Sequence, residues 1–216
     1  MVESDAGTPR ERYRAQVQEE IKAHAWGQIR SAGASALSLS AIAKRMGLSG
    51  PALYRYFAGR DELITALVRD AYRSLADAVR LQAEAGADLP ALARVLRGWA
   101  LADPQRYFLV YGTPVPGYEA PEDTTAIAAE IMAVLLDAGA AAAPVASAPS
   151  ALEVHLAEHR AWDGGHPAPP SALRLALAFW TRLTGVLSLE LAGHFAGMGF
   201  DPEQLYEAEV RALTGR

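Results

Sequence analysis

Apolar residues recur every three or four positions along most of the chain, a spacing that places them on one face of an α-helix. The first stripe predicts an amphipathic helix that begins at a capping box, Thr8 to Glu11, and ends near Gly33. No run of β-branched or aromatic residues alternates with polar ones as a strand requires, so we expect an all-α fold. The predicted buried face of the first helix consists of Tyr13, Val17, Ile21, Ala25 and Ile29.

Two short helices separated by a tight turn follow this long helix. Ser38 is suited to cap the first, which is expected to end at Gly47, and Ser49 to cap the second, which is expected to end at Gly59. Gly47 can adopt the left-handed backbone that such a turn requires. A long helix followed by two short ones is the layout of a three-helix helix-turn-helix domain, which we assign to residues 1–60.

Longer apolar stripes fill residues 61–216, where we expect a larger helical bundle. The first of these stripes predicts a connecting helix over residues 61–84. Another helix is expected to end near Gly139. Segments rich in glycine, proline and small residues predict loops, and they cover residues 112–121, 140–150 and 163–170.

Composition narrows the possible functions. The chain contains no cysteine, which excludes disulfides, thiol nucleophiles and thiolate metal sites. Residues 1–60 carry nine Lys or Arg against five Asp or Glu, whereas the remaining residues carry eleven against twenty. A basic N-terminal block before an acidic body is expected when only one end meets a polyanion such as DNA. We recognise neither a signal peptide nor a membrane span, and expect a cytoplasmic protein.

Residues 38–64, SLSAIAKRMGLSGPALYRYFAGRDELI, resemble the DNA-binding signature of the TetR family of transcription regulators. Arg60 stands where that family usually has lysine, which keeps the positive charge. The resemblance implies double-stranded operator DNA as a partner and a homodimer that binds a pseudo-palindrome. The positions that match the signature are Ser38, Ile42, Ala43, Gly47, Leu48, Ser49, Leu53, Tyr54, Phe57, Arg60 and Leu63.

The same resemblance assigns roles within this segment. Ser38, Tyr54 and Arg60 are implied to contact phosphates, which position a protein on DNA without reading its sequence. Small residues near the start of the second short helix let its backbone approach the bases. Lys44 and Arg45 either attract the DNA backbone or form solvated surface. The residues expected closest to base edges are Ser49, Gly50, Pro51, Ala52 and Arg55.

The C-terminal part resembles, less sharply, a TetR-like C-terminal domain named for a Trp-His-Gly motif. Trp180 and Gly185 match, but Thr184 stands where the histidine is expected. The resemblance implies that helices over residues 171–195 and 201–214 pair as a four-helix bundle between two subunits. Ala176, Gly185 and Ala192 would allow close approach there.

Several aromatic residues of the larger domain either line a pocket for an apolar or aromatic small molecule or form plain core. We expect the protein to be a repressor that such a ligand releases from DNA. The ligand would act by changing the pose of the helix over residues 61–84. The candidate ligand-binding residues are Trp99, Tyr107, Phe108, Tyr111, Trp162, Phe179, Trp180 and Thr184.

A rival hypothesis rests on the sequence HLAEH, from His155 to His159, whose spacing matches that of inverted zinc proteases. It would make the chain a helical metal-binding protein or an enzyme. No distant third metal ligand is evident, and we find no phosphate loop, catalytic triad or carboxylate pair. We therefore expect no catalytic residues, no metal and no cofactor.

Overall fold

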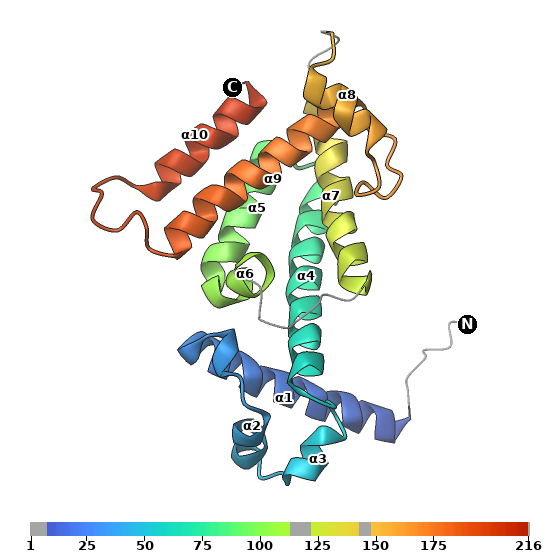
Figure 1. The fold of residues 1–216 in the computed structure, drawn as a ribbon, viewed down its shortest axis with the longest axis vertical. Coiled ribbons are helices and arrows are strands. Elements are labelled where there is room, and N and C mark those ends of the chain that lie inside the picture. The colour runs from blue at the N-terminus through green and yellow to red at the C-terminus, as the bar shows by residue number, and fades with distance from the viewer. Residues whose placement is uncertain (1–7, 113–121, 143–147, 216) are drawn as a thin grey trace. The chain divides into compact units, whose positions relative to one another are not determined.

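The computed structural model describes residues 8–112, 122–142 and 148–215 (Figure 1). Every regular element in these ranges is a helix, which confirms the predicted all-α fold. Contacts along the chain define two compact units, the first ending at Asp70 and the second beginning at Ala71. Apart from Gly112, the predicted loop 112–121 lies outside the described residues, as do residues 143–147 of the next loop and residues 1–7.

The first unit begins with α1 (Pro9–Ala32), a short 3-10 turn η1 (Ala34–Ala36), α2 (Leu39–Arg45) and α3 (Gly50–Tyr54). The Thr8 hydroxyl accepts from the Glu11 amide while the Glu11 carboxylate accepts from the Thr8 amide, so the predicted capping box is present. Tyr13 is 63% exposed, contrary to prediction, because residues 9–16 of α1 extend past the core. The residues of α1 that are buried are Val17, Ile21, Ala25 and Ile29.

The turn between α2 and α3 has the predicted chemistry. The hydroxyls of Ser38 and Ser49 cap α2 and α3 by accepting from the amides of Ala41 and Ala52. Gly47 follows the end of α2 with a φ of 68°, in the left-handed region. The α3 helix was predicted to continue to Gly59, but it ends at Tyr54.

The second unit contains the rest of α4 (Arg60–Glu84), α5 (Leu89–Ala102), α6 (Pro104–Tyr111), α7 (Glu122–Ala142), α8 (Ala151–Glu158), α9 (Pro170–Leu191) and α10 (Pro202–Thr214). Its centre is α9, which packs against α5, α6, α7, α8 and α10. Figure 1 shows α9 in orange between α10 and α7. The α9 side chains buried in this core include Leu173, Leu175, Phe179, Leu183 and Leu187.

Gly139 does not end α7 as predicted, because the helix continues to Ala142. A Cβ atom at Gly139 would lie 3.4 Å from the backbone oxygen of Ala172 in α9. This glycine is buried, so it marks a close approach between two helices rather than a helix end.

By length and composition alone, α7 and α9 are apolar enough to cross a membrane. The two helices pack against each other, and α9 is the central helix of its unit. Core helices of soluble proteins share these properties.

Candidate DNA-binding surface and ligand cavity

The α3 helix presents most of the residues predicted to lie near base edges. Ser49, Gly50, Pro51 and Arg55 are exposed, and Ala52 is half-buried. Leu53, on the opposite side, is 1% exposed and fixes the helix to the core of the first unit. The structure therefore brings these predicted residues together around one short helix.

Tyr54, Lys44 and Arg45 form the exposed surroundings of this turn. Tyr54 is 55% exposed, so its side chain is accessible, as the implied phosphate contact requires. Lys44 and Arg45 are exposed and occupy the last turn of α2, where cations oppose the partial negative charge of a helix end.

The Ser38 side chain faces the protein more than the predicted phosphate contact suggests. Its hydroxyl caps α2 and lies 3.0 Å from the Ser40 hydroxyl. Gln28 of α1 fixes the Ser38 backbone, because its side-chain oxygen accepts from the Ser38 amide at 2.8 Å and its nitrogen donates to the Ser38 carbonyl at 3.3 Å. Sequence reasoning missed Gln28, since a glutamine on a polar helix face carries no distinctive signal.

Arg60, the third residue implied to contact phosphates, forms a hydrogen bond inside the protein. It is half-buried, and its guanidinium donates to the backbone oxygen of Ala34 in η1 at 3.0 Å. The side chain thus ties the start of α4 to η1, whatever further contact it makes.

An ion pair joins α1 and α4 within the first unit. The Lys22 ammonium lies 2.6 Å from a carboxylate oxygen of Asp70 and 2.7 Å from one of Glu19. Burial lowers the pKa of Lys22, but the hydrogen bonds to Asp70 and Glu19 outweigh it and leave the pKa above its ordinary value. The amine is therefore held in its charged form.

The second unit contains a cavity of about 580 Å³, which we call the aromatic cavity. Its walls come from α4, α6, α7, α9 and the segment between α8 and α9. No charged side chain lines it among the described residues. The lining residues are Tyr72, Tyr111, Thr125, Ala126, Ala128, Ala129, Ile131, Met132, Ala161, Trp162, Gly164, Leu177 and Trp180.

Three of the eight predicted ligand-binding residues, Tyr111, Trp162 and Trp180, line this cavity. The structure places the other five elsewhere in the same unit. Phe179 is buried and Phe108 half-buried, and both belong to the core. The indole nitrogen of Trp99 donates to the Ser74 hydroxyl at 2.7 Å.

Tyr107 and Thr184 do not line the cavity, because their hydroxyls form hydrogen bonds within the core of the unit. The Tyr107 hydroxyl donates to the Thr184 carbonyl at 2.8 Å and lies 2.8 Å from the Ser188 hydroxyl. The Thr184 hydroxyl donates to the Trp180 carbonyl at 2.7 Å. These groups lock α6 to α9 and satisfy their own polar atoms.

Sequence reasoning missed Tyr72 and the α7 wall. Tyr72 lies on the helix taken as a connector, and its ring meets that of Tyr111 edge to face at 6.1 Å. Half of the α7 residues that line the cavity are alanines, and small residues of this kind also occur on ordinary helix surface. The departure of Tyr72 from the Leu and Ala stripe of its helix was the one available signal.

Tyr111 stands out chemically within the cavity wall. Its hydroxyl is buried and has no hydrogen-bond partner among the described residues, the one such side-chain atom in that part of the chain. Burial raises the pKa of Tyr111 well above the usual tyrosine value, so the phenol stays protonated. Its ring packs edge to face on Trp180 at 5.0 Å.

Arg160 shapes the wall that carries Trp162. Its guanidinium donates to the buried Asp163 carboxylate at 2.7 Å, to the Ala168 carbonyl at 3.1 Å and to the His166 carbonyl. The His166 ring in turn lies 3.2 Å from the Asp137 carboxylate of α7. This network holds the irregular segment between α8 and α9 against the rest of the unit.

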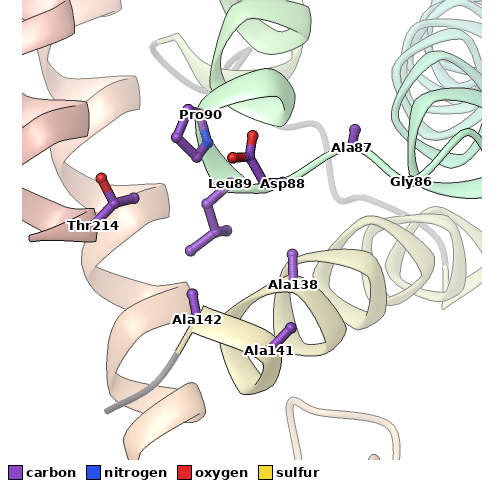
Figure 2. Close-up of a pocket in the computed structure, with 9 residues that line it drawn as sticks. All are labelled: Gly86, Ala87, Asp88, Leu89, Pro90, Ala138, Ala141, Ala142 and Thr214. Atoms are coloured by element: carbon purple, nitrogen blue, oxygen red, sulfur yellow. The ribbon is translucent and has the colours of Figure 1, made fainter. Parts of the chain in front are cut away.

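A second cavity of about 470 Å³ lies where α5 begins and where α7 and α10 end (Figure 2). Its lining is mostly alanine and glycine, without an aromatic side chain. Asp88, the one charged residue that lines it, already caps α5 by accepting from the Ala91 amide at 3.0 Å. This cavity offers less chemistry for recognising a ligand than the aromatic cavity does.

The two histidines of the HLAEH sequence are exposed, and their rings stack with centroids 4.1 Å apart. The Nδ1 atom of His159 lies 2.8 Å from the His155 carbonyl. Within the described ranges, no group of three or more His, Cys, Asp or Glu is placed to hold a metal ion.

The end of α9 and the segment after it leave apolar residues uncovered. Gly185 of α9 and Ala192, directly after this helix, are exposed, and Leu189 between them is 46% exposed. Met198 and Phe200, just after α9, are also exposed. Ala176, by contrast, is fully buried within the unit and contributes nothing to this surface.

Two family models match the chain. One, described as bacterial regulatory proteins of the tetR family, matches residues 21–67, and the other, described as a tetracyclin repressor-like C-terminal domain, matches residues 89–213. The first match contains α2, α3 and the second half of α1, and the second contains most of the second unit. The second description is broader than the Trp-His-Gly type, which stays a prediction.

Similar proteins support the same assignment. HTH-type transcriptional regulators of Mycobacterium tuberculosis (Rv1816) and Mycobacterium bovis (Mb1846) are each 36% identical to this chain, with 93% of this chain and 92% of theirs covered. A crystal structure of SCO4313, a protein assigned a regulatory role, is 66% identical, with a TM-score of 0.90 over 97% of this chain and 100% of that one. A Rhodococcus sp. RHA1 protein of unknown function shares the fold, with a TM-score of 0.67 at 19% identity over 100% of this chain and 98% of that one.

Proposed function

Since the chain belongs to the tetR family of bacterial regulatory proteins and is a DNA-binding transcription regulator, we propose that it represses transcription until a small apolar or aromatic molecule releases it from its operator. In this proposal residues 1–60 bind DNA and residues 61–216 bind the ligand and dimerise. A regulator of this kind acts where the DNA is, in the cytoplasm.

The observation that carries the proposal is the exposed side of α3. Ser49 and Pro51 at its start and Arg55 directly after its end are exposed, while Leu53 anchors the helix from the other side. A short helix held in this way can enter a major groove with its first residues against the base edges. The exposed Lys44 and Arg45 supply charge for the phosphates nearby.

A homodimer supplies the second recognition helix. One α3 reaches only half of an operator, and two copies would read half-sites about 34 Å apart along the DNA. The exposed Leu189, Met198 and Phe200, with Gly185 allowing close approach, support an interface through α9 and α10.

The ligand response is proposed to run through α4. This helix carries Tyr72 in the wall of the aromatic cavity, and its first residues belong to the DNA-binding unit. In this proposal the ligand and the DNA each stabilise a different pose of α4. Binding of one therefore weakens binding of the other, because both shift the equilibrium between the two poses.

The test is a mobility-shift titration with DNA from upstream of the chain's own gene, at two salt concentrations. We expect specific binding that weakens steeply with salt. Arg55→Ala should weaken it by about tenfold or more, the loss expected for one base-reading side chain. Arg80→Ala, an exposed arginine of α4 in the second unit, is the matched control and should bind as the unmodified protein does.

Failure of the protein to select any upstream fragment over unrelated DNA at low salt would overturn the regulator proposal. Equal affinity of the Arg55→Ala and unmodified proteins would remove α3 from the recognition surface.

A further inference from the structure

The residues that line the aromatic cavity indicate which class of ligand it would bind. If the proposed ligand response holds, two features bear on the class of the ligand: the composition of the cavity wall and the bonding of the Tyr111 hydroxyl.

The wall selects against charge. Its lining consists of aromatic, aliphatic and small side chains, whose polar groups are the Thr125 hydroxyl, two phenols and the indole N–H groups of Trp162 and Trp180, all of them uncharged. An ion moved from water into such surroundings loses its hydration and gains no partner of opposite charge. A carboxylate or an ammonium group on the ligand would therefore oppose binding.

The wall favours aromatic rings. Tyr72, Tyr111, Trp162 and Trp180 all contribute, and the Tyr111 ring already makes edge contacts with Tyr72 and Trp180. Aromatic pairs in such arrangements gain more than the burial of their area alone provides. At about 580 Å³, the cavity is within the size range of pockets that hold small organic molecules.

Tyr111 supplies a polar feature. Buried hydroxyls in this unit otherwise find acceptors, since Tyr107 donates to the Thr184 carbonyl and Tyr206 to the Ala93 carbonyl. Tyr111, one helical turn after Tyr107, has a buried hydroxyl with no partner among the described residues. A protonated phenol in this state is a donor that awaits an acceptor.

We propose that the aromatic cavity binds an uncharged aromatic molecule that carries a hydrogen-bond acceptor such as a ketone oxygen, and that this acceptor pairs with the Tyr111 hydroxyl. Tyr111 lines the cavity together with the rings that would contact the ligand's aromatic part, and its buried hydroxyl has no partner among the described residues. Neutral aromatic molecules with such an acceptor would therefore bind more tightly than those without one.

The test uses three probes with the same ring system and measures their binding to the purified full chain by equilibrium dialysis. The probes are 2-acetylnaphthalene, which is neutral with one acceptor, 2-ethylnaphthalene, which is neutral without one, and 2-naphthoate, which is charged. We expect the ketone to bind about five to ten times more tightly than the hydrocarbon, the gain of one net hydrogen bond. The carboxylate should bind at least tenfold more weakly than the ketone.

Tyr111→Phe should abolish the preference for the ketone while leaving the affinity for 2-ethylnaphthalene within about twofold. Tyr72→Phe removes the other phenol that lines the same cavity and is the matched control, which should keep the preference. Ala129→Leu narrows the cavity from the α7 side without touching a tyrosine, and it should weaken both neutral probes.

The inference is overturned if no neutral probe binds, if 2-naphthoate binds as tightly as the ketone, or if Tyr111→Phe retains the ketone preference. The same preparations are assayed for operator binding. Loss of selective DNA binding with intact probe selectivity would overturn the proposed function alone, whereas normal DNA binding with no probe selectivity would overturn this inference alone.

Discussion

Tyr107 and Tyr111 occupy successive turns of α6 with ring centroids 5.3 Å apart, yet their hydroxyls differ in bonding. Tyr107 bonds to Thr184 and Ser188 of α9, whereas Tyr111 bonds to none of the described residues. The first tyrosine therefore joins two helices, and the second lines the aromatic cavity with a buried donor that has no acceptor among the described residues.

This contrast predicts opposite effects of the same substitution. Tyr107→Phe should lower the free energy of unfolding by about 1 to 2 kcal/mol, because it leaves the Thr184 carbonyl and the Ser188 hydroxyl without their partner. Tyr111→Phe, measured without ligand, should leave stability unchanged or raise it slightly. Urea denaturation followed by circular dichroism measures both, and a loss at Tyr111 equal to that at Tyr107 would contradict the assigned bonding.

The ion pair between Arg97 of α5 and Glu190 of α9 should be costly to break from either side. Both side chains are mostly shielded from water, and the guanidinium makes two hydrogen bonds to the carboxylate, one of them at 2.9 Å. We expect Glu190→Gln and Arg97→Leu each to destabilise the protein by about 2 to 4 kcal/mol, since each leaves a shielded partner unmatched. In the double variant the loss should be smaller than the sum of the two, and strict additivity in thermal unfolding would argue against the pair.

Glu153 predicts a dependence of stability on pH. Its carboxylate accepts from the Ser150 amide at 2.7 Å and from the Arg174 side chain at 3.0 Å, and these bonds hold its pKa below the usual 4.5. A carboxyl with a lowered pKa in the folded state stabilises fully above its ordinary pKa and loses this effect as the pH falls through the lowered value. The stability gap between the unmodified protein and Glu153→Gln should thus be present at pH 7 and shrink below about pH 4.

The control for this experiment is Glu158→Gln, at the exposed end of the same helix. A stability gap for Glu153→Gln that stays constant from pH 7 to pH 3 would show that the carboxylate charge plays no part.

Lys44 and Arg45 are predicted to act on DNA through phosphates alone. Replacing both by alanine should weaken binding to operator and to unrelated DNA by similar factors and should reduce the slope of log affinity against log salt by about two. Fluorescence anisotropy at four salt concentrations gives this slope. A loss confined to the operator would instead make these residues readers of sequence.

Sequence reasoning located elements best where local chemistry decides them. The capping box at Thr8, the caps at Ser38 and Ser49 and the turn at Gly47 all lie where they were predicted, because each depends on neighbouring residues only. Gly139 was misjudged for the complementary reason. Its role depends on Ala172, which is distant in sequence and adjacent only after folding.

The candidate sites divide in the same way. The exposed residues of α3 follow from a local motif, so their clustering was predictable. Of the aromatic residues singled out in the larger domain, Tyr111, Trp162 and Trp180 line the aromatic cavity and the others do not. A Tyr or Trp at helical spacing looks the same whether it faces a cavity, as Trp180 does, or a fixed partner, as Trp99 does.

The alanines of α7 in the cavity wall leave the shape of this cavity open to change. Ala126, Ala128 and Ala129 are partly exposed and fall outside the buried core, so larger or smaller side chains there would resize the chamber without rebuilding the helices around it. Under the proposed ligand response, a few substitutions on this one helix would change which molecule fits the cavity.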